Sequence, residues 1–257
     1  MLSTCFRPGA RCSRTDGRVW MDAMTNTATE PPQGMTGRQA QRSAETRRRL
    51  CEATLDVLCE VGYDSITTPM IAARAGVSRG AQTHHFATKA DLLVAAFEHL
   101  LQSWEDARQA AFGGMDLRQL PFESYLRFVW SEIFSRPSYI AALELMLAAR
   151  VDSALGERLR QALDSPASQR NLRWSRLLRF SDVKKEEQFQ HMTLCLLRGM
   201  AIHASFNRSD AVNEGLLEAW IALARQVIAL ERPDAADRRQ ERSNEPAPPR
   251  RLDDAGD

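Results

Sequence analysis

Apolar residues recur at three- and four-residue spacing along most of the chain between about residues 40 and 232. One clear example of this spacing is Leu92, Leu93, Ala96, Phe97, Leu100, Leu101 and Trp104. Such a stripe forms one face of an α-helix, whereas a half-buried strand alternates apolar and polar positions. No segment alternates in that way, and the pattern therefore predicts an all-α protein.

Glycines, prolines and short polar runs interrupt the helical pattern. They fall at Gly62, Gly76, Gly113-Gly114, Pro121, Pro137, 180–182 and 207–209. These breaks divide the chain into about nine helices. One pattern, from about Ser153 to Leu178, contains Pro166, and we expect that proline to kink or divide the helix.

The two ends of the chain lack periodicity. Residues 1–38 are rich in Thr, Gly, Pro and Arg, and residues 233–257 combine prolines with mixed charges. Neither composition favours a packed core, so we expect both ends to be disordered. The helical part is then divided into a domain at 39–87 and a larger domain at 88–232.

The pattern at 39–87 predicts three helices. The first runs from about Ser43 to Val61 and ends at Gly62. Thr67 is placed to cap a second, short helix, which ends at Gly76, a residue that allows a sharp left-handed turn. Ser78 then caps a third helix of sequence RGAQTHH. Helix, tight glycine turn and helix is the arrangement of the DNA-binding helix-turn-helix motif.

The third helix has the properties of a DNA-reading helix. Its start directs backbone N–H groups outward, where they bind phosphate, and Arg79, Gly80, Thr83 and His84 share one face. Thr88 and Asp91 form a capping box that opens a fourth helix. Lys89 then lies in the first turn of that helix, where a cation favours phosphate binding.

The overall net charge of +1 does not indicate a nucleic-acid partner, but the distribution of charge does. Residues 1–49 contain nine arginines and four acidic residues, a net charge of +5. Arg47, in the run Arg47–Arg49 at the start of the first helix, either contacts phosphate or belongs to a solvated face.

The ordered set of signals from Thr46 to Leu93 resembles the N-terminal signature of the TetR family of one-component regulators. The matching positions are Gly62-Tyr63, Thr67, Ile71-Ala72, Ala75–Ser78, His85-Phe86 and Lys89. Three positions depart from the family pattern: Gln82 replaces an apolar residue, Thr83 replaces an aromatic one, and Met70 stands where an acidic residue often closes the capping box of the second helix. Gln82 reads adenine if it points outward and belongs to the core if it does not.

The resemblance implies a homodimer that inserts two recognition helices into successive major-groove turns of a palindromic, double-stranded operator. Most members of the family repress transcription, and a small effector bound by the C-terminal domain moves the fourth helix and releases the DNA. The candidate DNA-binding residues are Arg47, Thr67, Ser78, Arg79, Gly80, Gln82, Thr83, His84, His85 and Lys89.

The last two helices are the candidate dimer interface. Their apolar residues cover a face too broad for one packing surface, and in this family the last two helices of each subunit form a four-helix interface. The candidate interface residues are Met192, Leu196, Met200, Leu216, Trp220, Leu223 and Val227.

A cavity for the effector is expected among the fourth to eighth helices, which carry most of the large aromatic residues. Most of these residues are equally consistent with an ordinary core. Their chemistry favours an apolar or aromatic effector. The candidate ligand-binding residues are His99, Trp104, Phe122, Trp130, Phe134, Tyr139, Met146 and Trp174.

Other classes of function lack a sequence signal. We expect no cofactor and no metal, because the pair Glu187 and His191 on one helical turn does not make a site. No apolar run approaches the roughly 18 residues of a membrane span, and the five cysteines form no paired motif, so we expect a cytoplasmic protein. A helical protein-interaction scaffold and a helical enzyme remain the alternatives, although the enzyme lacks a visible nucleophile–base pair or phosphate loop.

Overall fold

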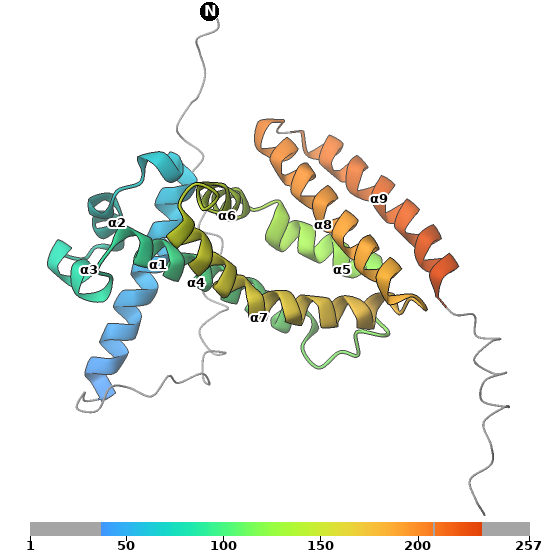
Figure 1. Cartoon of the computed structure of the whole chain (residues 1–257), viewed down its shortest axis with the longest axis horizontal. Helices are drawn as coiled ribbons and strands as arrows, with labels where there is room; N and C mark the ends of the chain where they lie inside the picture. The colour runs from blue at the N-terminus through green and yellow to red at the C-terminus, as the bar shows by residue number, and fades with distance from the viewer. Residues whose placement is uncertain (1–36, 208, 233–257) are drawn as a thin grey trace, which may run out of the picture.

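A computed structural model of the chain describes residues 37–207 and 209–232, and the part it describes is built from helices (Figure 1). The all-α prediction is confirmed, and the predictions for residues 1–36 and 233–257 lie outside the described residues. The elements are α1 (Gly37–Ser65), α2 (Thr68–Ala75), α3 (Arg79–His85), α4 (Lys89–Phe112), α5 (Phe122–Val129), the π-helix η1 (Trp130–Phe134), α6 (Pro137–Ala148), α7 (Ser153–Leu178), α8 (Val183–Phe206) and α9 (Asp210–Glu231).

Two helices differ from their predictions, α1 in its bounds and α7 in its continuity. α1 begins at Gly37, almost two turns before Ser43, so residues 37 and 38 belong to a helix and not to a tail. Its regular backbone is interrupted at Gly62, where φ is 76° and ψ is 173°, as the glycine signal indicated. α7 continues through Pro166, so this proline does not divide the helix; that it kinks the helix stays a prediction.

The turn between α2 and α3 forms as predicted. Gly76 has φ 63° and ψ 40°, the left-handed conformation, and its N–H donates to the carbonyl of Ala73 at 3.1 Å. Ser78 accepts a hydrogen bond from the N–H of Ala81 at 3.1 Å and so caps α3. Thr67 is at the N-cap position of α2, but its side chain makes no capping bond.

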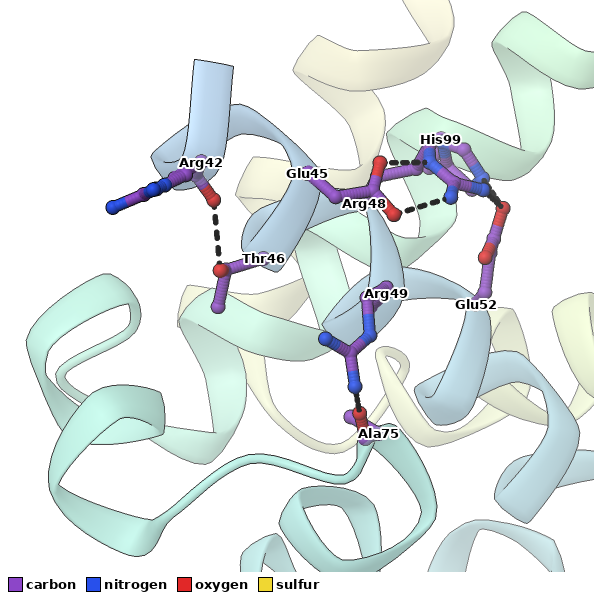
Figure 2. Close-up of polar contacts among 8 residues, drawn as sticks. All are labelled: Arg42, Glu45, Thr46, Arg48, Arg49, Glu52, Ala75 and His99. Carbon is purple, nitrogen blue, oxygen red and sulfur yellow. Dashed lines mark hydrogen bonds and ion pairs between the residues drawn. The ribbon is translucent and has the colours of Figure 1, made fainter. Parts of the chain in front are cut away.

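Charged residues of α1 hold the neighbouring elements in place (Figure 2). Arg49 donates to the carbonyl of Ala75, at the end of α2. Arg48 pairs with Glu45 and Glu52 on its own helix at 2.6 and 2.5 Å. The second and third arginines of the basic run therefore have partners within the fold.

His99 lies at the edge of this network. Its Nε2 lies 3.9 Å from the carboxylate of Glu52, across the contact between α4 and α1 (Figure 2). The role of His99 in orienting a ligand stays a prediction. Helical spacing located His99 on α4, but the side of the helix that it occupies depends on the packing of α1.

Two apolar cores lie in the chain, and α4 contributes to their common boundary. The first joins α1–α4 to α6 and the start of α7, through residues such as Leu50, Phe97 and Leu145. The second joins α5, η1, α6, α8 and α9 to the end of α7. Trp104, on α4, packs against both. In Figure 1, α1–α3 lie at one end, α8 and α9 at the other, and α4 and α7 run between them.

We predict that Gly76→Ala lowers the free energy of unfolding by about 1–2 kcal/mol, the usual cost of a left-handed conformation for a residue with a Cβ. The added Cβ would also meet Arg49 Nη2 at 3.0 Å. Urea unfolding followed by circular dichroism measures the change. Gly80→Ala is the control, because its Cβ meets only Ser78 Oγ, at 4.0 Å, and helical alanine is favoured over glycine. Equal stability of the Gly76 variant and wild type would contradict the prediction.

We predict that the stability of the protein falls as the pH decreases from 7.5 to 5.5, and that His99→Gln reduces this dependence. Burial lowers the pKa of His99 below 6.5, although the nearby carboxylate of Glu52 opposes the shift. The unfolded chain therefore takes up a proton at a higher pH than the folded chain, and stability present above about pH 6.5 is lost as the pH falls. Urea unfolding at several pH values tests this, and identical slopes for the variant and wild type would contradict it.

Candidate nucleic-acid interface

One face of α3 is open to solvent. Ser78, Arg79, Gly80, Thr83 and His84 are all exposed along it. The Thr83 hydroxyl donates to the carbonyl of Arg79 at 2.9 Å, one turn earlier on the same helix. Arg79 and His84 make no hydrogen bond to a neighbouring helix in the described structure, so this face presents polar groups that are available to a partner.

Gln82 lies on the opposite face of α3. Its side chain is only 6% exposed, and its Nε2 donates to the carbonyl of Phe86 at 3.2 Å. The inclusion of Gln82 among the DNA-binding residues is therefore wrong: the amide satisfies the end of α3 and does not point outward. This placement resolves the alternative left open by the sequence, since a polar residue at an apolar position of the family pattern is kept in the core by a hydrogen bond.

The start of α4 is fixed by the predicted capping box. Thr88 Oγ1 accepts from the N–H of Asp91 at 3.1 Å, and the Asp91 carboxylate accepts from the N–H of Thr88 at 2.9 Å. Lys89 follows in the first turn, with its Nζ 3.4 Å from the Tyr63 carbonyl and 5.1 Å from the centre of the Tyr63 ring. Lys89 therefore also holds the segment after Gly62 against α4.

Arg47 and His85 meet at the end of α3. Arg47 Nη1 donates to the carbonyl of His85 at 3.2 Å, and its guanidinium lies 4.4 Å from the centre of the Phe86 ring. Burial, followed by repulsion from His84 and Arg47, lowers the pKa of His85. A neutral His85 is a hydrogen-bonding group and not a phosphate-binding cation at neutral pH.

Two polar contacts connect these elements to the rest of the chain. Asp91, which caps α4, pairs with Arg158 of α7 at 2.9 Å. Glu144 of α6 accepts from the N–H of Tyr63 at 3.1 Å, directly after the break in α1. A shift of α6 or α7 would therefore change the position of the end of α1 and of the start of α4.

The predicted ligand-binding aromatics form a packed cluster. Phe122, Trp130, Phe134, Tyr139 and Trp174 are all buried in the second core. Their rings contact one another: the ring centres of Phe134 and Tyr139 are 4.5 Å apart, and those of Phe122 and Trp174 are 5.7 Å apart. Trp104 joins the cluster through Tyr139, with ring centres 5.7 Å apart. Met146 packs against the first core instead, which separates it from this group.

The predicted dimer residues divide into exposed and buried ones. Met192, Leu216, Leu223 and Val227 are exposed. Leu196 and Trp220 are partly buried against the second core. Met200 is 3% exposed and belongs to that core, so its assignment to an interface is wrong.

The sequence analysis missed further exposed apolar residues on the same two helices. They are Ile202 and Phe206 on α8, and Val212 and Leu230 on α9. Phe206 is 85% exposed. On α9 the exposed residues follow three- and four-residue steps, the same spacing that identifies a helix face, and this periodicity was the available signal.

The residues that the structure describes include neither a candidate membrane-spanning helix nor a candidate metal site. None of the helices there combines the length and apolar character that a membrane crossing requires. No group of three or more His, Cys, Asp or Glu side chains is arranged there to hold a metal ion.

Comparison with known proteins supports the interpretation of the first four helices. A sequence model described as "Bacterial regulatory proteins, tetR family" matches residues 50–96. The HTH-type transcriptional regulator CymR of Pseudomonas putida is 28% identical over 193 residues, which cover 74% of this chain and 95% of CymR.

Two crystal structures share the fold. A putative TetR-family transcriptional regulator from Rhodococcus sp. is 22% identical, with a TM-score of 0.55, and the alignment covers 68% of this chain and 96% of that protein. The multidrug binding protein EbrR, complexed with imidazole, is 22% identical, with a TM-score of 0.52 and coverage of 75% and 97%. These likenesses are to transcriptional regulators and not to enzymes, and residues 50–96, which include the helix-turn-helix, match the TetR family of bacterial regulatory proteins.

Proposed function

We propose that the protein is a homodimeric repressor that binds a palindromic operator and leaves it when a small effector binds to the helical C-terminal part. The observation that carries this proposal is α3, a short capped helix with one polar face exposed and the other packed in the core. The exposed face is not used by any other element that the structure describes. A short helix with an exposed polar face is suited to binding in the major groove of DNA.

The base-reading residues in this proposal are Arg79, Thr83 and His84. A guanidinium binds both acceptors of guanine in the major groove, and hydroxyl or imidazole groups bind single acceptors or donors. Gly80, on the same face, adds no side chain and so lets the backbone approach the duplex closely. Thr83 must give up its bond to the carbonyl of Arg79, or share it, to read a base.

The phosphate contacts come from the borders of this face. Thr67 and Ser78 lie at the starts of α2 and α3, where backbone N–H groups point outward. Lys89 uses one of its three donors on Tyr63, and Arg47 uses one guanidinium nitrogen on His85. The remaining donors of both cations are assigned to phosphate, which supplies affinity that depends on salt.

The second copy of the chain is assigned to the exposed face of α8 and α9. Large apolar side chains are exposed along both helices, and the two helices lie side by side at the end of the molecule away from α3 (Figure 1). A group of large apolar side chains exposed on one surface of an isolated chain marks an interface. Pairing two such faces gives a four-helix interface and presents two copies of α3 to successive turns of the duplex.

Release by an effector follows from the contacts of α4. Asp91 stabilises the start of α4 and also pairs with Arg158 of α7, while Glu144 of α6 holds the end of α1. A ligand that moves α6 or α7 therefore changes the position of the DNA-binding helices, and the two affinities are reciprocally linked. EbrR, of similar fold, is a multidrug binding protein and is complexed with imidazole, which supports small-molecule binding in this architecture.

A helical scaffold without DNA binding is the alternative function. It accounts for the exposed face of α8 and α9 but gives no role to the polar face of α3. It also predicts no salt-dependent affinity for DNA.

We predict that the purified protein binds a DNA fragment flanking its own gene. Its affinity for that fragment should fall steeply between about 50 and 200 mM salt, as expected for a protein that makes several contacts with phosphate. Arg79→Ala is expected to change the order of affinities among operator variants, with a loss of about 1–3 kcal/mol on the preferred one. Lys89→Ala is expected to weaken all variants similarly. Fluorescence anisotropy with a panel of single-base operator changes makes both measurements.

Arg136→Ala is the control for these variants. Arg136 is an exposed arginine before α6, paired with Glu132 at 2.7 Å, and its loss should leave DNA binding unchanged. The repressor proposal fails if no flanking fragment binds at low salt. Base reading by Arg79 fails if its variant loses the same affinity on every operator.

We predict that Leu223→Glu converts the protein from a dimer to a monomer, because a carboxylate at the centre of the apolar face cannot be desolvated without a partner. Light scattering coupled to size-exclusion chromatography gives the mass directly. Val151→Glu, at an exposed apolar residue between α6 and α7, is the control and should remain dimeric. A wild-type protein with the mass of one chain would refute the dimer proposal.

A further inference from the structure

A cleft of about 440 Å³ lies where the end of α4 meets the loop to α5, the start of α5 and the second half of α7. Phe112, Leu117 and Tyr125 provide apolar and aromatic wall. Tyr125 also belongs to the aromatic cluster of the second core, through contact with Trp174 at 6.1 Å between ring centres. The cleft therefore opens at the edge of the region where an effector cavity was expected.

The charged residues of the cleft are mostly arginines. Four arginines line it, against two carboxylates, Glu105 and Asp116; the arginines are Arg108, Arg118, Arg173 and Arg176. Arg108 and Arg173 are the most enclosed of the ion-paired arginines here, with 14% and 15% of their side chains exposed. Both bind the same carboxylate, Glu105, at 2.7 and 2.9 Å. One carboxylate, whose side chain is 39% exposed, is therefore shared by two arginines.

A fifth arginine lies behind this group. Arg170 is one turn before Arg173 on α7, and the Nε atoms of both are buried without a hydrogen-bond partner. Burial lowers the pKa of Arg170, and repulsion from Arg198, Arg108 and Arg173 lowers it further. Buried donors and buried positive charge without enough carboxylates are costly, and proteins keep them where an anion is to be bound.

We propose that this cleft binds a small organic carboxylate with an apolar or aromatic body. The carboxylate is received by Arg173 and Arg108, in competition with Glu105, and by Arg118 from the loop between α4 and α5. The body lies against Phe112 and Tyr125. Arginine binds carboxylates through paired hydrogen bonds, which are stronger than bonds between neutral groups. The apolar wall favours an organic acid over free inorganic phosphate. As an effector site, the inference rests on the proposed function, and it adds a charge to the expected apolar or aromatic ligand.

The position of the cleft allows a bound carboxylate to affect the DNA-binding helices. α4 and α7 are linked by ion pairs at two places: Asp91 with Arg158 near α3, and Glu105 with Arg173 at the cleft. A ligand that takes Arg173 from Glu105 changes the second link while the first still holds the start of α4. The change in spacing between α4 and α7 is then passed along α4 to its capping box.

The test is a thermal-shift titration of the full chain at constant ionic strength. The probes are benzoate, 2-naphthoate and octanoate, each compared with its uncharged amide, and inorganic phosphate. We expect at least one carboxylate to raise the melting temperature in a saturable manner and its amide to have little effect. Equal shifts by acids and amides, no shift by any of the acids, or a shift by phosphate as large as that of the best acid would each overturn the inference.

Two variants locate the binding site. Arg173→Gln and Arg118→Gln should each weaken the best carboxylate by about tenfold, as expected for loss of a charge-assisted bond. Arg118 is an exposed loop residue, so its variant reports on binding even if the Arg173 variant folds poorly. Arg160→Gln, at an exposed arginine on the same helix, is the matched control. Unchanged affinity in the Arg118 variant, or in a folded Arg173 variant, would place the ligand elsewhere and overturn the inference.

DNA affinity is measured separately on the same preparations. If the protein binds its flanking DNA but no carboxylate stabilises it, the inference fails and the proposed function stands. If a carboxylate binds at the cleft but no DNA does, the proposed function fails and the cleft remains a carboxylate site.

Discussion

The sharing of α4 between two cores is the constraint on which the rest of the structure depends. The first part of this helix completes the packing of α1–α3, and Trp104, further along, reaches the aromatic cluster of α5–α9. Its start is fixed by the bonds between Thr88 and Asp91, and Asp91 also binds Arg158. Because the carboxylate that caps the helix is also the one that pairs with Arg158, one side chain contributes both to the stability of the start of α4 and to the contact with α7.

The turn from α2 to α3 was predictable because its signals are local. A left-handed glycine, a serine cap and a capping box act over three or four residues, and Gly76, Ser78, Thr88 and Asp91 all take their expected roles. Predictions that required knowledge of which side of a helix meets a neighbour were less successful. Gln82 and Met200 are at positions of the correct helices, but each faces the core, since that choice is made by contacts between distant segments.

The arginines around the cleft also show that the sequence does not reveal contacts between distant segments. The segment 165–181 contains four arginines and no acidic residue, a signal visible in the sequence. Its meaning depends on Arg108 and Glu105 of α4, which lie more than sixty positions earlier and are brought to α7 only by the fold. The arginines of α1 illustrate the converse: all three members of the run Arg47–Arg49 have partners within the fold, and no spacing rule predicts which partner each one takes.

The burial of Gln82 limits how much of a DNA sequence one chain distinguishes. With this residue turned inward and Gly80 lacking a side chain, three exposed side chains of α3 remain for base edges. Each good base contact discriminates by about 1–3 kcal/mol, so a single α3 covers only a few base pairs. A DNA sequence of only a few base pairs occurs many times by chance in a bacterial genome. In the proposed dimer, selection of one operator therefore depends on two such short sequences at a fixed separation, and the geometry between the paired chains determines that separation.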